Sequence, residues 1–265
     1  MSHQKSGTIR KTRKWDAVVN RFREYGKPAY DDADQIIALT LDAAAPELIK
    51  AGEDVGLCYT FHLLNMLVCI SSKDGWHTLL GDRVLKNNIL FPNSSIFDLT
   101  SQLQLAIDKY IDDIGYSSTD ISEMAQRAIG DAMSSIVVDK PVNLFNNDES
   151  ISYLIKDLAT PAGASRFWLN FLSKFTVRLL TLHLIQMTIR EFGSLSLRDE
   201  NNISHFNYAL ITKCIQSMRN AADLCQNRSS GAHYQDTFDY GNTSDFITEV
   251  LRTFIRDLKK QEDEP

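Results

Sequence analysis

Apolar residues recur at helical spacing along most of this chain, and this pattern constrains the fold more than any other feature of the sequence. In the most regular stretch the apolar positions are Ile96, Leu99, Leu103, Ala106, Ile107, Tyr110 and Ile114. This spacing places the side chains on one face of an α-helix. Alternating runs rich in Val and Ile, which are typical of strands, are nearly absent. The sequence therefore predicts an all-α multi-helix bundle of about nine or ten helices, with long helices in the C-terminal half.

Capping residues and helix breakers set the limits of the expected helices. Ser94 or Ser95 can cap the helix at residues 96–114, and Pro46 predicts a break or a restart in an earlier helix. The sequence Thr-Ser-Asp at 243–245 gives the last helix its start signal. We expect helices at about residues 15–25, 31–52, 53–70, 77–86, 96–114, 121–138, 150–159, 164–192, 203–226 and 244–259.

A polar, Asn-rich segment at residues 139–150 is the best candidate for a boundary within the chain. It would separate an N-terminal helical half (15–138) from a C-terminal helical half (150–260). A basic, flexible arm at residues 1–14 would precede both. A chain of 265 residues can also form one compact unit, so both organisations stay open.

Charge is distributed unevenly along the chain. Residues 1–27 contain eight Lys and Arg against two acids, which leaves −12 for the rest of a chain whose total is −6. A basic arm on an acidic body suggests contact with nucleic acid, or with an acidic surface of a partner or of the chain itself. The candidate phosphate contacts are Lys11, Arg13, Lys14, Arg21 and Arg23. The acidic body argues against a general nucleic-acid coat, which usually needs a broad basic face.

Two apolar stretches, at residues 55–70 and 167–189, are long enough to be weighed as membrane spans. The first has 16 residues and contains His62, whereas Lys174 and Arg178 interrupt the second. Charged side chains are costly in hydrocarbon. We interpret both stretches as helices buried inside a protein, and we expect no membrane contact.

The cysteine pattern indicates thiols rather than a metal site or disulfides. Cys58, Cys69, Cys214 and Cys225 form no C-x-x-C pair, and no His lies nearby at metal-ligand spacing. The chain also begins without the charged segment and apolar run of a secretory signal. We therefore expect reduced thiols, a cytoplasmic location, and neither a metal nor a cofactor.

Common catalytic motifs are missing, which leaves Arg and His as the side chains that could carry chemistry. The sequence has no G-x-x-x-x-G-K, no G-x-G-x-x-G after a strand, no G-x-S-x-G and no H-E-x-x-H. An Arg precedes a His by four to six intervening residues in the pairs Arg178 and His183, Arg198 and His205, and Arg228 and His233. The first pair lies inside an apolar run, and we interpret it as a core pair with local hydrogen bonds.

Arg228 and His233, in the stretch NRSSGAHY, resemble the Arg/His motif of the HEPN superfamily of helical ribonucleases and nucleic-acid-binding domains. The form is similar to that of abortive-infection C-terminal domains, and the resemblance covers about residues 203–260. It implies a ribonuclease or RNA-binding effector of toxin or anti-phage defence type, with an active site at a homodimer interface. Arg198 and His205 are the alternative catalytic pair.

The residue types of such a pair suit RNA cleavage without a metal. A His with its ordinary pKa of about 6.5 can move protons near neutrality, and an Arg fork can hold the phosphate. Two positions depart from the family pattern. Ser229 follows the Arg where Asn, Asp or His is common, and Tyr234 follows the His where Gly is usual.

A second hypothesis has no active site. The chain would then be a non-catalytic helical adaptor or scaffold subunit that binds another protein, a regulator or a nucleic acid. The absence of a common catalytic motif and the contrast between basic arm and acidic body favour this interpretation.

Overall fold

The computed structural model describes residues 12–24, 33–71, 73–81, 95–138, 155–192, 200–219, 221–230 and 239–263. Within these ranges the chain forms ten α-helices, one short 3-10 helix and no strand, so the predicted all-α bundle is confirmed. The elements are α1 (Arg13–Glu24), α2 (Ala33–Ala51), α3 (Val55–Ile70), α4 (Trp76–Leu80), α5 (Ile96–Asp113), α6 (Asp120–Val138), η2 (Asp157–Ala159), α8 (Pro161–Phe192), α9 (Glu200–Arg219), α10 (Ala222–Ser230) and α11 (Tyr240–Asp263).

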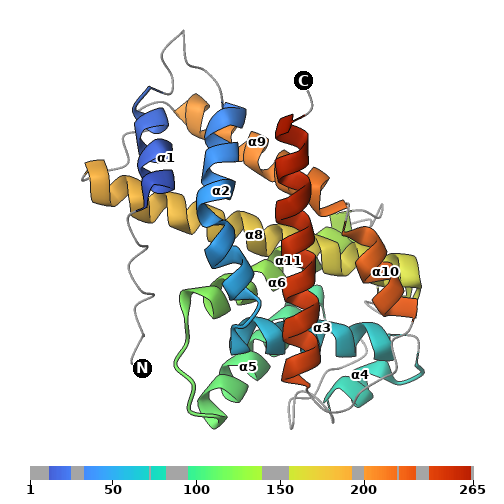
Figure 1. Ribbon diagram of the computed structural model, residues 1–265. Coiled ribbons are helices and arrows are strands. Elements are labelled where there is room, and N and C mark those ends of the chain that lie inside the picture. The colour runs from blue at the N-terminus through green and yellow to red at the C-terminus, as the bar shows by residue number, and fades with distance from the viewer. Residues whose placement is uncertain are drawn as a thin grey trace.

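Helix α8 is the centre of the bundle. It has 32 residues, and it crosses behind α2 and α11 in Figure 1. Helices α6, α10, α9 and α2 all pack against it. It begins at Pro161, three residues before the predicted start, because the backbone N–H of Gly163 donates to Thr160 Oγ1 at 3.0 Å. Proline suits the first helical position, where an N–H would have no partner within the helix.

A cluster of aromatic rings joins helices that are far apart in the sequence. The ring of Phe61 on α3 lies 5.6 Å from that of Trp168 on α8 and 5.3 Å from that of Phe246 on α11, measured between centroids. Helices from both sides of residues 139–150 therefore share one hydrophobic core. Those residues lie outside the described part of the chain, and a boundary there stays a prediction.

Helix α3 is buried on nearly all sides, as its composition predicts. Asp54 caps it: the N–H of Leu57 donates to Oδ1 at 2.9 Å, and the hydroxyl of Thr119 donates to Oδ2 at 2.7 Å. Burial raises the pKa of Asp54, and these hydrogen bonds oppose the rise only in part. The carboxylate thus ties the start of α3 to the segment that leads into α6.

Helix α5 begins where the sequence indicates, at Ser95, whose side chain forms a capping box with Asp98. Its buried face contains Ile111 rather than the expected Ile114, which is 47% exposed. The reason is that the helix ends at Asp113, so Ile114 no longer follows the helical path.

Pro46 does not break α2, which runs without interruption from Ala33 to Ala51. Pro46 is exposed, whereas Ala44, Ala45 and Leu48 around it are buried. A proline inside a helix removes one backbone hydrogen bond. Here that bond is lost on the solvent side, and packing on the other side holds the two parts in line.

The long helix expected at residues 203–226 is two helices. α9 ends at Arg219, and α10 begins at Ala222 and reaches Ser230. The N–H of Ala221 donates to the carbonyl of Met218 in the turn between them. This break redirects α10, which then packs along α8.

The last helix, α11, begins at Tyr240 rather than at residue 244. Asp239 provides the start: its Oδ1 accepts from the N–H of Asn242 at 3.0 Å, and its carbonyl accepts from the N–H of Thr243 at 3.1 Å. Asp is among the strongest capping residues, and this one comes before the Thr-Ser-Asp signal. Thr243 and Ser244 are instead buried inside the helix.

Among the described residues, no single helix is long and apolar enough to cross a membrane. Gln35–Ala51 and Val55–Ile70 would pass that test only as a pair, and they are bent by 72° relative to each other.

Candidate functional site

The Arg/His pairs of the HEPN-like motif lie largely outside the described residues. Arg228 belongs to the last turn of α10 and His205 to α9, and only the backbone of each is described. His233 and Arg198 fall outside the described ranges. Their role in catalysis therefore stays a prediction, although the turn expected around Arg228 is helical as far as Ser230.

Four of the five candidate phosphate contacts lie on helix α1, which packs against α2. Arg13 and Lys14 form the first turn of α1, and Lys14 Nζ lies 2.7 Å from Asp42 Oδ2 on α2. Arg21 is half-buried and Arg23 is described only in its backbone, while Lys11 lies outside the described residues. One candidate phosphate contact is thus in an ion pair with the acidic body.

Arg178 and His183 point to different sides of α8, so they do not form a local core pair. Five residues along a helix correspond to a rotation of about 140°. His183 is buried against Trp15 of α1, with ring centroids 6.2 Å apart, and burial lowers its pKa to about 4. Arg178 is half-buried and reaches Asp131 on α6.

The side of α8 that carries Arg178 borders a groove of about 700 Å³. Three helices line it: α6 with Met124, Arg127, Asp131, Ser134 and Ser135, α8 with Lys174, Val177, Arg178, Thr181, Leu182 and Ile185, and α9 with Ile211. Helices α6 and α8 run antiparallel, as contacts between the start of one and the end of the other indicate. This volume lies within the range of ligand-binding pockets.

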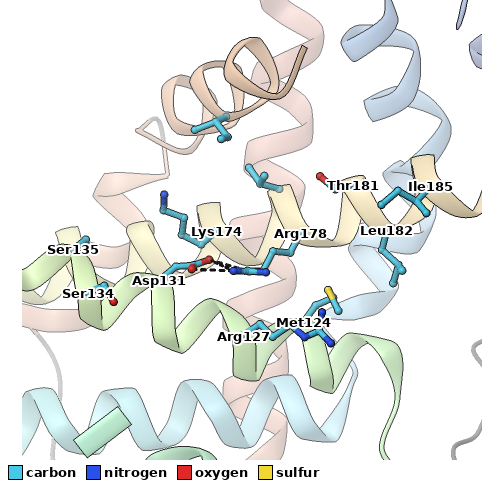
Figure 2. A pocket seen from close by; sticks show the side chains of 12 residues that line it. Met124, Arg127, Asp131, Ser134, Ser135, Lys174, Arg178, Thr181, Leu182 and Ile185 are labelled. Atoms are coloured by element: carbon cyan, nitrogen blue, oxygen red, sulfur yellow. Dashed lines mark hydrogen bonds and ion pairs between the residues drawn. The ribbon is translucent and has the colours of Figure 1, made fainter. Parts of the chain in front are cut away.

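A bidentate ion pair crosses the floor of the groove. Arg178 Nε donates to Asp131 Oδ2 at 2.7 Å, and a terminal nitrogen donates to Oδ1 at 2.9 Å, as the dashed lines in Figure 2 mark. Nearby, Asn170 Nδ2 donates to Ser135 Oγ. Two-pronged pairs of this kind fix the orientation of the guanidinium as well as its position. The pair is one-third exposed, so solvent and a ligand can reach it.

Two further cations stand on either side of this pair. In Figure 2, Lys174 points away from Asp131, and Arg127 extends from α6 beside Met124. Among the described residues neither Arg127 nor Lys174 has an ion-pair partner. Because Asp131 is the one carboxylate among the described groove residues and pairs with Arg178, this lining has a net charge of +2.

Apolar side chains dominate one end of the groove and polar ones the other. Ser134 and Ser135 lie at the end near Lys174, whereas Leu182 and Ile185 lie at the opposite end, as Figure 2 shows. Ile211 of α9 adds to the apolar lining. A ligand of this groove would need both an acidic and an apolar side.

The sequence alone does not indicate this groove. In the sequence, Lys174 and Arg178 stand out only as charges that interrupt an apolar helix. Their spacing of four, together with the same spacing of Arg127 and Asp131, was the available signal, because residues four apart share a helix face. The pairing of α6 with α8 could not be read from spacing.

The described groove residues offer binding chemistry rather than proton transfer. They include neither His nor Cys, and they present cations, one paired carboxylate, hydroxyls and apolar groups. No group of three or more His, Cys, Asp or Glu within the described ranges could hold a metal ion. No disulfide joins any of the four cysteines, and burial raises the pKa of Cys58 and Cys214 to about 12, which makes these thiols poor nucleophiles.

Comparison with known proteins adds no relative. The chain matches no family model, no curated protein and no solved structure.

Proposed function

We propose that this chain is a non-catalytic helical adaptor that holds an acidic, amphipathic segment of a protein partner in the groove between α6 and α8. The observation that carries the proposal is the presence of uncompensated cations, Arg127 and Lys174, beside an apolar wall in one open groove.

The charge arrangement favours an acidic ligand. Arg178 is already neutralised by Asp131, so it shapes the floor while Arg127 and Lys174 stay available. A carboxylate that approaches the groove would meet two positive charges at different places across its width. Charged contacts of this kind set specificity and encounter rate more than they set affinity.

The apolar lining supplies the affinity that the cations do not. Leu182, Ile185 and Ile211 are all half-buried, so part of each side chain is open to a ligand. The α8 part of the groove, from Lys174 to Ile185, corresponds to about 17 Å of helix, or roughly three turns. A partner helix of similar length, with apolar and acidic faces, fits this surface in the manner of helix-in-groove recognition.

A peptide segment fits better than a nucleic acid. A polyanion gains affinity from many phosphate contacts, and the groove offers two uncompensated cations on a body of net charge −12 outside residues 1–27. A short acidic segment needs only a few carboxylates near these cations. The acidic body therefore repels such a segment less than it repels a polyanion.

Binding of a defined peptide tests the proposal. The probe is a labelled peptide of about 18 residues with Leu on one helix face and Glu on the other, followed by fluorescence anisotropy. We expect saturable binding that weakens by about tenfold when Arg127→Gln and Lys174→Met are combined. The matched control Lys109→Gln removes an exposed cation from α5, outside the groove, and should leave the affinity unchanged.

Other outcomes would overturn the proposal. Equal weakening by the α5 control would mean that only net charge matters. Preferential binding of a single-stranded RNA probe through Arg127 and Lys174 would favour the nucleic-acid alternative. Metal-independent cleavage of that RNA, lost in His233→Ala while the fold persists, would favour the HEPN-like ribonuclease.

A further inference from the structure

We infer that the exposed stripe of α5 is a second docking surface, and that it takes a basic, partly apolar segment of another protein. The stripe consists of Phe97, Ser101, Leu105, Asp108 and Asp112. It goes beyond the groove proposed above because its helix, charge and ligand are different.

Two large apolar side chains on this stripe face solvent. Phe97 is 71% exposed and Leu105 is 54% exposed, and Ser101 lies between them on the same face. The five stripe residues fall within about 80° around the helix axis. Apolar side chains exposed singly are ordinary, but two of them aligned with a charged end make a surface of defined chemistry.

The C-terminal end of the stripe is acidic. Asp108 and Asp112 are exposed there, and Asp108 Oδ1 accepts a hydrogen bond from Gln126 Nε2 at 2.8 Å. A shallow hollow of about 500 Å³ adjoins the stripe between α5 and α6, and it includes Glu123 and Arg127 as well as Leu105. Asp108, Asp112 and Glu123 outnumber the two cations of this region, Lys109 and Arg127, so the surface has a net negative charge.

The helix that carries the stripe is held firmly in place. A capping box at Ser95 fixes its start, and Tyr110 stacks on Tyr59 of α3 with ring centroids 3.7 Å apart. Gln104 also donates to the carbonyl of Gln126 on α6 at 3.1 Å. A rigid helix presents its outer face at little cost in conformational entropy on binding.

Charge complementarity selects the occupant. A basic segment would place its cations against Asp108 and Asp112 and its apolar side chains against Phe97 and Leu105. A second copy of the chain docked through this helix fits poorly, because a parallel pair would bring the acidic ends together and an antiparallel pair would place Phe97 against acids. Arg127 lines both this hollow and the groove, so α6 separates the two surfaces.

A basic peptide tests the inference independently of the groove. The probe is a labelled helical peptide of about 18 residues with Leu on one face and Lys on the other. We expect binding that falls by about tenfold in the double variant Phe97→Ser, Leu105→Ser and by a similar factor in Asp112→Lys. Tyr208→Ser removes an equally exposed aromatic residue from α9 and should have no effect, as should Lys174→Met in the groove.

The fold is not at risk in the α5 variants or in Tyr208→Ser, because each of these altered side chains is exposed. Unchanged affinity in the α5 variants, or a loss of the same size in Tyr208→Ser, would overturn the inference. Sedimentation of the unliganded chain tests whether a second copy of the chain occupies the stripe instead. A dimer that dissociates on Phe97→Ser would show self-association in place of a basic partner. Failure here leaves the acidic-peptide result of the groove untouched, because that experiment uses a different probe and different variants.

Discussion

The two sides of α8 use polar residues in opposite ways. On one side His183 is buried against Trp15, and the surroundings favour its neutral form. On the other side Arg178 keeps its charge in a groove open to solvent and is held by Asp131. The first side is closed by packing, whereas the second is shaped by an ion pair that leaves room beside it.

This difference separates a structural use of a polar residue from a recognition use. A buried His contributes by fitting among its neighbours, so its removal or protonation should affect stability. An ion pair that is one-third exposed contributes little to stability, because solvent screens it. Its value lies in fixing the shape and charge of the groove. The following changes would break or sharpen this contrast.

Trp15→Ala should cause the largest loss on the closed side. Trp15 is fully buried between α1 and α8, and removing such a side chain costs about 4 kcal/mol of unfolding free energy. Chemical denaturation would measure the loss. A cost below about 1 kcal/mol would mean that α1 does not close this side of α8.

Acid should destabilise the closed side next. Burial lowers the pKa of His183 from its ordinary 6.5 to about 4, against an opposing effect of Asp120. Neutral His183 therefore contributes stability that is fully present above pH 6.5 and lost as the pH falls through about 4. The contribution is about 3 kcal/mol, and urea unfolding across this pH range would measure it. In His183→Gln this part of the pH dependence should vanish; the same slope in both proteins would contradict the assignment.

Asp131→Ala should have the smallest effect on stability, about 1 kcal/mol, because the ion pair is one-third exposed. The same substitution should lower stability but raise the affinity for the acidic peptide. Without Asp131 the groove gains a third uncompensated cation, Arg178, so the acidic peptide should bind more tightly. Thermal unfolding and anisotropy on the same samples would measure both. Weaker binding together with a large loss of stability would instead indicate a structural pair.

Much of the fold could be predicted from the sequence, because local signals set it. Ser95 and its capping box, and the apolar face from Ile96 to Ile107, lie within one helix. The predicted helix boundaries differ from the observed ones where two local signals compete or where tertiary packing sets the boundary. Asp239 caps α11 four residues upstream of Thr243, so the helix begins earlier than predicted. The break between α9 and α10 contains neither Gly nor Pro, so no breaker residue in the sequence indicates it.

The groove was harder to predict because it depends on contacts between distant residues. Asp131 and Arg178 are 47 positions apart, and only the packing of α6 on α8 brings them together. Spacing drew attention to the pair Arg178 and His183, which share a helix but face opposite regions. The predicted catalytic pair Arg228 and His233 is untested by the geometry, since His233 lies outside the described residues.

A double-mutant cycle between Lys174 and the acidic peptide tests most directly whether the groove recognises acidic charge. The affinities of the original protein and of Lys174→Met are measured for the Glu-bearing peptide and for the same peptide with Gln in place of Glu. If Lys174 contacts peptide carboxylates, the two changes will be coupled by about 1 kcal/mol, and Gln will weaken binding to the original protein much more than to the variant. Strictly additive losses, or no loss in either case, would contradict an adaptor that reads acidic segments through this groove.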